Sequence, residues 1–266
     1  MTTLGKLIDV MSPSRLDCAQ RCLAQFRFRY LDRLPSPKPA TTVLGSAMDA
    51  AANDVYLSKM DTGTTLSGDD VADRFVHEFD WHATQVEDWT VDRGKTMDTG
   101  VRVATTWRDN IAQHVTPSQV QPQFKRDVVD PVSGDQFTFT GYVDTMIRVG
   151  DQEAVADLKT TGRRYPTNQI VKATQPAVYT LLTGQPTFVY HVVTTTAKPS
   201  TQCLTGTLSD SHHRHTLIRT GMVRRQVAAA YSSGDWLPNR GHMLCSRRWC
   251  PYWRQCEVEY GGEVAQ

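Results

Sequence analysis

Cysteines near the two ends of the chain are the sequence feature that most constrains its fold. Three lie in the C-terminal segment CSRRWCPYWRQC, at Cys245, Cys250 and Cys256, and two lie in the N-terminal segment CAQRC, at Cys18 and Cys22. Six cysteines in a chain with no recognisable export signal are more typical of reduced thiols or metal ligands than of disulfides. A site with four thiolates would need ligands from both ends, so it would hold the two ends together.

Four thiolates suit either Zn²⁺ or an iron–sulfur cluster, and the spacing alone does not decide between them. Paired CxxC knuckles, which many zinc sites use, are absent. The alternative is a set of buried, reduced thiols packed beside Trp249, Tyr252 and Trp253, because free cysteine often behaves as a small apolar residue. We place the sixth cysteine, Cys203, in this second class.

The composition is that of an ordinary globular protein. With 266 residues, 39% of them hydrophobic and 21% charged, the chain can bury one sizeable core. No segment is apolar over the length needed to cross a bilayer, so we expect a cytoplasmic protein with no membrane partner. The 29 basic and 28 acidic residues give no support for a general attraction to polyanions. Eight arginines and one acid between 212 and 254 predict either a local phosphate-facing surface or a solvated helix face.

Hydrophobic periodicity and turn residues divide the chain into a helical first half and a mixed second half. The predicted helices span residues 14–30, 41–60, 69–89, 92–114, 168–182 and 211–233, and the predicted strands span 120–129, 136–149, 154–160 and 187–196. The order strand, strand, strand, helix, strand predicts an α/β fold in which helices flank a mixed central β-sheet. We expect a single domain over 1–266, with a mainly helical lobe (1–119), a core (120–233) and a Cys-rich cap (234–266).

An acidic and lysine cluster near the middle of the chain carries the predicted chemistry. Asp144 ends the sequence GYVD, and Asp157 and Lys159 lie two residues apart in DLK, so they point to one face of a strand. If these two strands pair as a hairpin, both carboxylates and the ammonium converge at one edge of the sheet. The carboxylates and the backbone carbonyl of Leu158 are hard oxygen ligands for Mg²⁺ or Mn²⁺. The alternative is an exposed hairpin with incidental charges.

Such a group suits phosphodiester hydrolysis. The metal would lower the pKa of a bound water and offset charge on the scissile phosphate, while Lys159 would orient the water and stabilise the transition state. Gln175 and Tyr179 lie four residues apart on the next predicted helix and share one face, from which they could contact a nucleic-acid phosphate or base. Without such a site they are an ordinary helix pair.

These motifs resemble those of a known family. The segments GYVD (141–144), DLKTT (157–161) and QPAVY (175–179) are similar to motifs of PD-(D/E)XK nucleases of the RecB and Cas4 group, and the segment 12–35 is similar to that group's opening helix. The resemblance implies a restriction-endonuclease-like core with a helical N-terminal insertion and a Cys-bound C-terminal cap. It also implies a Mg²⁺- or Mn²⁺-dependent deoxyribonuclease, an exonuclease that acts on DNA ends, prefers single strands and runs 5′ to 3′.

The resemblance also implies roles for individual residues. The metal would be bound by Asp144, Asp157 and the Leu158 carbonyl, and the catalytic set would be Asp144, Asp157, Lys159, Gln175 and Tyr179. In Cas4 and AddB-type nucleases, one cysteine of the opening helix and three C-terminal cysteines hold a [4Fe–4S] cluster. The matching residues here are Cys22, Cys245, Cys250 and Cys256, which leaves Cys18 as a core or spare thiol.

One departure from the family pattern concerns the metal site. Where the group commonly has Gly, three residues and then His, this chain has Gly45 followed by Asp49. Asp49 would supply an oxygen ligand in place of an imidazole, with an altered metal preference or rate. The alternative is that Asp49 is a surface residue on an Ala-rich helix.

Two other functions fit the sequence. The first is a catalytically weak DNA-end adaptor, monomeric or oligomeric, that recruits a helicase, a recombinase or a Cas1-like partner in phage recombination, repair or CRISPR adaptation. The intact Asp144, Asp157 and Lys159 argue against it, and the change at Asp49 argues for it. The second is a zinc-stapled hydrolase with a non-nucleic substrate. The chain has no phosphate-binding GxxxxGK[ST] motif, which fits a stand-alone nuclease.

Overall fold

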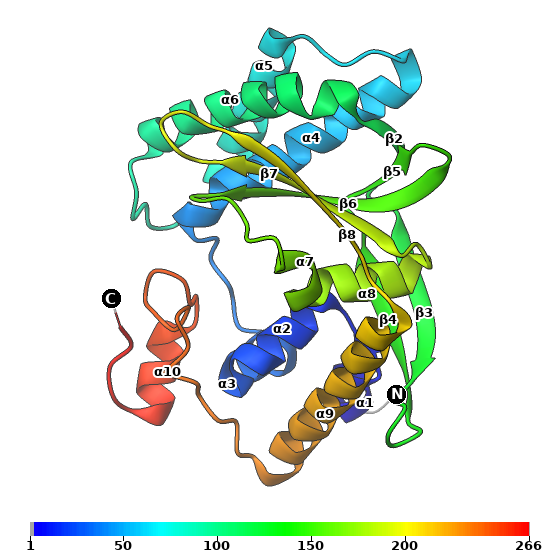
Figure 1. Cartoon of the computed structure of the whole chain (residues 1–266). Coiled ribbons are helices and arrows are strands. Elements are labelled where there is room, and N and C mark those ends of the chain that lie inside the picture. The colour runs from blue at the N-terminus through cyan, green and yellow to red at the C-terminus, as the bar shows by residue number, and fades with distance from the viewer. Residues whose placement is uncertain (1–2, 266) are drawn as a thin grey trace. The chain divides into compact units, whose positions relative to one another are not determined.

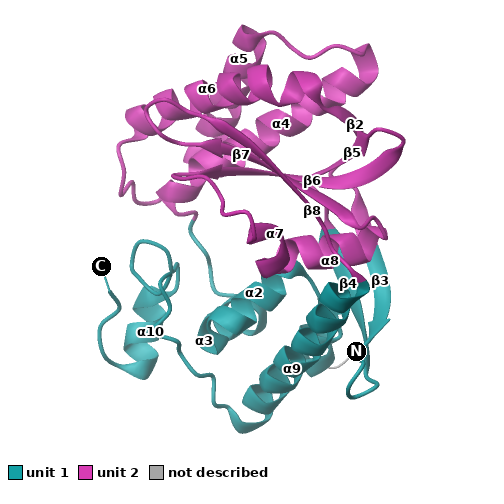
Figure 2. Cartoon of the chain, in the orientation of Figure 1, with its two compact units in different colours: residues 1–37, 125–141, 210–266 teal, residues 38–124, 142–209 magenta. Residues whose placement is uncertain are grey.

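The computed structural model describes residues 3–265 and divides into two compact units (Figure 2). Unit 1 comprises residues 1–37, 125–141 and 210–266, and unit 2 comprises residues 38–124 and 142–209. Each unit is therefore assembled from segments that lie far apart in the sequence. Across residues 3–265, no helix combines the length and apolar character that crossing a membrane requires.

Unit 2 is built around a five-stranded mixed sheet (Figure 1). Its strands lie in the order β2 (Thr116–Val120), β5 (Thr145–Val149), β6 (Gln152–Thr161), β7 (Thr187–Thr194) and β8 (Thr201–Thr207). Only the central pair, β6 and β7, runs parallel; the other neighbours are antiparallel. These two central strands are buried along most of their length, as expected for strands that are covered on both faces.

Helices cover both faces of this sheet. Figure 1 shows α4 (Val43–Thr62), α5 (Gly68–Ala83) and α6 (Arg93–Asn110) on one side, and α7 (Gln169–Lys172) and α8 (Thr174–Thr183) on the other. Short 3₁₀ turns occupy Ala40–Thr42 and Ala112–His114. Side chains of the three long helices pack with Leu158 and Val193 of the sheet in one apolar cluster. Since successive side chains of a strand alternate between faces, Leu158 faces these helices and its neighbour Asp157 faces the side of α8.

Unit 1 contains both chain ends and a small sheet. Its elements are α1 (Thr3–Ile8), β1 (Val10–Met11), α2 (Pro13–Arg21), α3 (Leu23–Phe26), a π-helical turn (Arg27–Leu31), β3 (Gln123–Val129), β4 (Gln136–Tyr142), α9 (Asp210–Ser233) and α10 (Trp253–Tyr260). The strand order is β1-β4-β3, with β1 parallel to β4. The N-terminal helices α1 and α2 contact the long helix α9.

The predicted α/β fold with helices around a mixed sheet is confirmed, and two predicted elements are divided. The helix predicted over 14–30 breaks at Cys22, whose backbone is extended with φ −165° and ψ 117°. The strand predicted over 136–149 ends at Tyr142, and a new strand begins at Thr145 in the other sheet. Asp144 therefore lies in the bend between two strands. The prediction that it lies on a strand was wrong.

Candidate active site and cysteine pocket

The side chain of Asp157 lies at the centre of the candidate active site. It comes from the middle of β6 and is 1% exposed. Its Oδ1 accepts a 2.7 Å hydrogen bond from Nε2 of Gln175 on α8. Its buried Oδ2 forms an ion pair with the Lys159 ammonium and has no hydrogen-bond partner. The predicted convergence of Asp157 and Lys159 on one face of the strand is therefore present.

Asp144 reaches the same place from the bend before β5. Its backbone carbonyl accepts a 2.9 Å hydrogen bond from the amide of Gln121, which has a positive φ of 48°. Strands β5 and β6 pair as the predicted antiparallel hairpin, with Thr145 opposite Ala156. The carboxyl groups of Asp144 and Asp157 lie close enough to share a hydrogen bond.

Burial is the main cause that raises the pKa of Asp157 well above its ordinary value. The charge of Asp144 acts in the same direction, while the Lys159 ammonium opposes both. For Lys159, burial lowers the pKa, but Asp157 and Asp144 outweigh it and raise the pKa above the ordinary value. The ammonium thus stays charged, and the site carries more acidic than basic groups.

Asp49 joins this group from α4. Gly45, one turn earlier, allows a close approach to the end of β6, because a Cβ at Gly45 would lie 3.3 Å from Oγ1 of Thr160. The Asp49 side chain keeps solvent-exposed surface, yet surrounding protein and the charge of Asp144 raise its pKa to about 7, while Lys159 lowers it. The electrostatic interaction with Asp144 and Lys159 places Asp49 at the site and not on an unrelated surface of the helix.

Gln175 and Tyr179 lie side by side on α8, as the sequence predicted, and hydrogen bonds connect them to Asp157; their contact with nucleic acid stays a prediction. Gln175 bonds to Asp157, and the Tyr179 hydroxyl shares a hydrogen bond with Gln175. Tyr179 is 7% exposed, and burial raises its pKa to about 12. The pair therefore fixes the orientation of the Asp157 carboxylate.

Lys38 and His82 are two residues of the site that the sequence gave no reason to select. Nζ of Lys38 lies 2.8 Å from Nδ1 of His82 on α5. Burial lowers the pKa of Lys38, and the nearby charge of Asp49 opposes that shift. Burial and the charge of Lys38 lower the pKa of His82. Lys38 lies within the Pro-rich segment PSPKP (35–39), and no periodicity in the sequence links it to a histidine so far along the chain.

The oxygen atoms of this site fit a divalent metal ion in their chemistry. Apart from its ion pair with Lys159, the buried Oδ2 of Asp157 has no hydrogen-bond partner, and the excess of carboxylates over ammonium groups favours a cation. The Leu158 carbonyl lies 3.4 Å from Lys159 Nζ, and so at the same end of the site. Within residues 3–265, no three Asp, Glu, His or Cys side chains are close enough together to hold a metal ion as they stand. A metal here would therefore use one or two carboxylates together with a carbonyl and water, as Mg²⁺ commonly does.

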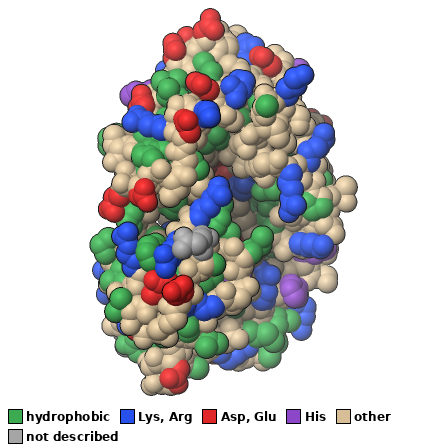
Figure 3. Space-filling view, turned by 90° about the vertical axis from the view of Figure 1, so that its left-hand side faces the viewer, with side chains coloured by type: hydrophobic (Ala, Val, Ile, Leu, Met, Phe, Trp, Pro, Cys, Tyr) green, Lys and Arg blue, Asp and Glu red, His purple; other side chains and the backbone are tan. Residues whose placement is uncertain are grey.

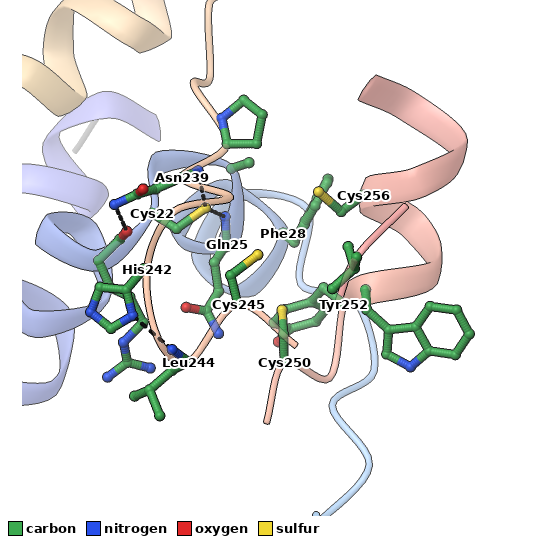
Figure 4. A pocket seen from close by; sticks show the side chains of 15 residues that line it. Cys22, Gln25, Phe28, Asn239, His242, Leu244, Cys245, Cys250, Tyr252 and Cys256 are labelled. Atoms are coloured by element: carbon green, nitrogen blue, oxygen red, sulfur yellow. Dashed lines mark hydrogen bonds between the residues drawn. The ribbon is translucent and has the colours of Figure 1, made fainter. Parts of the chain in front are cut away.

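Unit 1 holds a second candidate site, a pocket lined by cysteines (Figure 4). The four predicted ligands, Cys22, Cys245, Cys250 and Cys256, all line this pocket. All six cysteines of the chain are free, and Cys18 is buried outside the lining of the pocket. Cys203 is exposed on β8, so the expectation that it is buried was wrong.

Hydrogen-bond donors surround the sulfur atoms of this pocket. Sγ of Cys22 accepts bonds of 3.4 Å from the backbone amides of both Gln25 and Asn239. The extended backbone that breaks the predicted helix at Cys22 makes this residue the N-cap of α3, so its sulfur accepts from the amide of Gln25 in the first turn of that helix. Burial raises the pKa of Cys250 to about 11, and the neighbouring cysteines act in the same direction. The absence of a group of three metal-binding side chains within residues 3–265 applies to these cysteines too, so the structure brings the four sulfurs to one pocket without forming a metal-binding group.

Comparisons with known proteins find similarity over most of the chain. The model of the PD-(D/E)XK nuclease superfamily matches residues 10–257. No curated protein matches the sequence. Among solved structures, the chain is similar to a provisionally named exonuclease from Eubacterium rectale, with a TM-score of 0.55 and 14% identity over 87% of this chain and 84% of that chain. The structure of SSO0001 is similar at a TM-score of 0.40, with 12% identity over 85% of this chain and 84% of that chain. The similarity to the exonuclease structure supports the restriction-endonuclease-like fold, and at this identity it supports no conclusion about activity.

Proposed function

Because the chain belongs to the PD-(D/E)XK nuclease superfamily, we propose that it is a metal-dependent deoxyribonuclease that hydrolyses phosphodiester bonds at DNA ends. The observation that carries this proposal is the arrangement of Asp157, which is buried, bonded to Gln175 and paired with Lys159. A carboxylate held on both sides in this way is organised for a task that needs a fixed orientation.

Some of these residues would hold the metal, and others would orient the water and the ligands. Asp144, Asp157 and the Leu158 carbonyl would hold Mg²⁺ or Mn²⁺, with Asp49 as a further ligand. When bound, the metal would lower the pKa of a water molecule and offset negative charge on the scissile phosphate. Lys159 would orient that water and stabilise charge on the phosphate oxygens, since its ammonium remains protonated. Gln175, supported by Tyr179, would keep Asp157 from rotating out of the site.

The action of the enzyme is proposed by analogy with the RecB and Cas4 group: exonucleolytic, with a preference for single strands and a 5′-to-3′ direction. We also propose a structural [4Fe–4S] cluster on Cys22, Cys245, Cys250 and Cys256. The shared pocket of these four residues and the amide donors to Cys22 support it. Such a cluster would fasten the C-terminal cap, 234–266, to the N-terminal helices of unit 1.

The rival function is a DNA-end adaptor with little activity, and it keeps one observation in its favour, the Asp49 carboxylate where the family commonly has histidine. A metal titration separates the two. Single-stranded DNA labelled at the 5′ or the 3′ end is incubated with the purified protein in EDTA, Mg²⁺, Mn²⁺ or Ca²⁺. Release of short labelled products with Mg²⁺ or Mn²⁺ only, and from one end only, is expected of the exonuclease. Tight binding without cleavage under every metal would select the adaptor.

A further inference from the structure

The surface of unit 1 beside the cysteine pocket carries an unusual concentration of arginine and tryptophan. Guanidinium carbons lie 5.1 Å from the Trp249 ring for Arg248, and 4.6 Å and 4.9 Å from the Trp253 ring for Arg247 and Arg254. Significant cation–π contacts occur about once per 70–80 residues, and here three fall within eight residues. The chain as a whole has a formal net charge of only +1, and Figure 3 shows both signs on one face, so DNA affinity must come from local groups of this kind.

The two tryptophans differ in how much ring surface is free to contact a ligand. Trp253 is half-buried, and its ring already has two guanidinium groups within 5 Å. Trp249 has one guanidinium group over its ring, that of Arg248 at 5.1 Å, and is 40% exposed. A planar ring with this much free surface can receive another planar group, and Trp249 is the one in this segment that meets the condition.

The backbone beneath Trp249 is held in place. The amides of Trp249 and Cys250 donate to the carbonyl of Ser246 at 3.2 Å and 2.8 Å, and the amide of Arg247 donates to Ala265 at 2.7 Å. Tyr252, three residues on, is buried against Phe28 with a ring-centroid distance of 5.9 Å. Trp249 is therefore presented on a fixed support, which reduces the entropy lost when a ligand orders it.

Of the three arginines near Trp249 and Trp253, one is paired with an acid and, in the part of the chain that the structure describes, two are not. Arg247 forms an ion pair with Glu257, and Glu259 is paired with Arg27. Arg248 and Arg254 are exposed, and among the described residues neither has an ion pair. An exposed ring with Arg248 beside it, and with the exposed Arg254 in the same segment over the Trp253 ring, supplies the aromatic and cationic groups that bind bases and phosphates of a nucleic-acid strand.

We propose that Trp249 stacks on an unpaired base of single-stranded DNA while Arg248 and Arg254 contact the adjacent phosphates. The proposal rests on the proposed function, because it names the substrate of that nuclease and a place on unit 1 that holds it. An unpaired strand is the ligand because the faces of paired bases are covered by their neighbours in a duplex. Trp253 serves as support, since its ring is occupied by Arg247 and Arg254.

Binding of a fluorescein-labelled oligothymidine by the full-length protein tests the proposal. It is measured by fluorescence anisotropy in EDTA, so that hydrolysis does not interfere. Trp249→Ala is expected to weaken binding about tenfold, the usual effect of losing one stacked base. An abasic strand of equal length, which keeps the phosphates and lacks the bases, should bind wild type and Trp249→Ala alike. Trp81→Ala is the matched control, because Trp81 is 62% exposed on α5 and lies in unit 2.

A second variant covers the case in which Trp249→Ala disturbs the cap. Arg248→Gln changes only an exposed side chain, and it should reduce the slope of log K against log salt by about 0.7 in magnitude, the contribution of one phosphate contact. Unchanged affinity in Trp249→Ala together with an unchanged salt slope in Arg248→Gln would overturn the proposal while leaving the nuclease function intact. If the wild type binds neither strand at low salt, the proposed function fails as well.

Discussion

Gln175 donates a 2.7 Å hydrogen bond to the buried carboxylate of Asp157, across the space between a helix and the central strand of the larger sheet. The two residues are 18 positions apart in the sequence, and α7 lies between β6 and Gln175, which is the second residue of α8. The bond satisfies one oxygen of a carboxylate that has little access to water. The other oxygen faces Lys159, so each half of the carboxylate has a separate partner.

Replacing Gln175 by alanine is expected to lower nuclease activity about 10- to 100-fold, the usual effect of removing a group that orients a metal ligand. It should also cost about 1–3 kcal/mol of stability, because Oδ1 of Asp157 is left buried without a donor. Rates with saturating Mg²⁺ and thermal melting measure the two effects. Gln152→Ala, at the exposed start of the same strand, is the control and should change neither.

The cysteine pocket makes a separate prediction about metal content. Cys22→Ser should remove iron and acid-labile sulfide from protein purified without oxygen, because Cys22 is the one ligand from the N-terminal end. Cys203→Ser should leave both unchanged, since Cys203 is exposed on a strand of unit 2. Metal analysis and visible absorbance report the outcome. Wild-type protein with stoichiometric zinc and no iron would show that the pocket holds a different metal.

Asp130 makes a prediction about acid stability. Burial disfavours its charge, but bonds from the Val132 amide at 2.9 Å and from Arg225 at 2.6 Å outweigh burial and lower its pKa from 3.8 to about 2. A pKa that is lower in the folded state stabilises the fold at pH values above the unfolded value. That contribution is lost as the pH falls from about 4 towards about 2. Asp130→Asn should therefore lower the melting temperature strongly at pH 7 and by about half as much near pH 3, which lies midway between the two pKa values, whereas the exposed Asp151→Asn should show no such difference.

Close packing of α6 against α5 explains a requirement for glycine. A Cβ added at Gly100 would lie 1.9 Å from Cζ of Phe75, which is fully buried. Gly100→Ala should destabilise the protein by about 1–3 kcal/mol in denaturant unfolding, because the ring has little room to move. Gly68→Ala, at the first turn of α5 with no atom within 4 Å of the added Cβ, is the control. Equal midpoints for the two variants would mean that α5 and α6 pack differently.

Local patterns in the sequence predict many of the helices and strands. The β-branched and apolar run 154–160 is a strand, and the alternation within it placed Asp157 and Lys159 on one face. Sequence could not show that Asp144 lies in a bend, because strand formers on both sides of it, within 136–149, read as one strand and hide the change from one sheet to the other. Nor could it show the contact between Lys38 and His82, which depends on how α5 packs beside the start of unit 2. β8, with the polar sequence TQCLTGT, had no apolar pattern to predict it.

The break at Cys22 is the clearest case in which tertiary structure overrides a helical pattern. Apolar residues recur at helical spacing on both sides of it, yet the backbone there is extended and the sulfur caps the next helix. The prediction that this cysteine and the three C-terminal ones approach one another came from the family resemblance. The structure places all four around one pocket, a relationship between the two ends of the chain that local sequence does not encode.

The requirement for the Asp157 carboxylate in DNA hydrolysis is tested by the rate at which Asp157→Asn degrades end-labelled single-stranded DNA with Mg²⁺ or Mn²⁺. Asparagine keeps the size of the side chain and removes the charge that the metal and Lys159 require. We predict that this rate falls by at least about 10²–10³-fold, that single-stranded DNA binding is retained in EDTA, and that the matched Asp151→Asn keeps full activity. Activity of Asp157→Asn equal to that of the wild type would contradict this requirement.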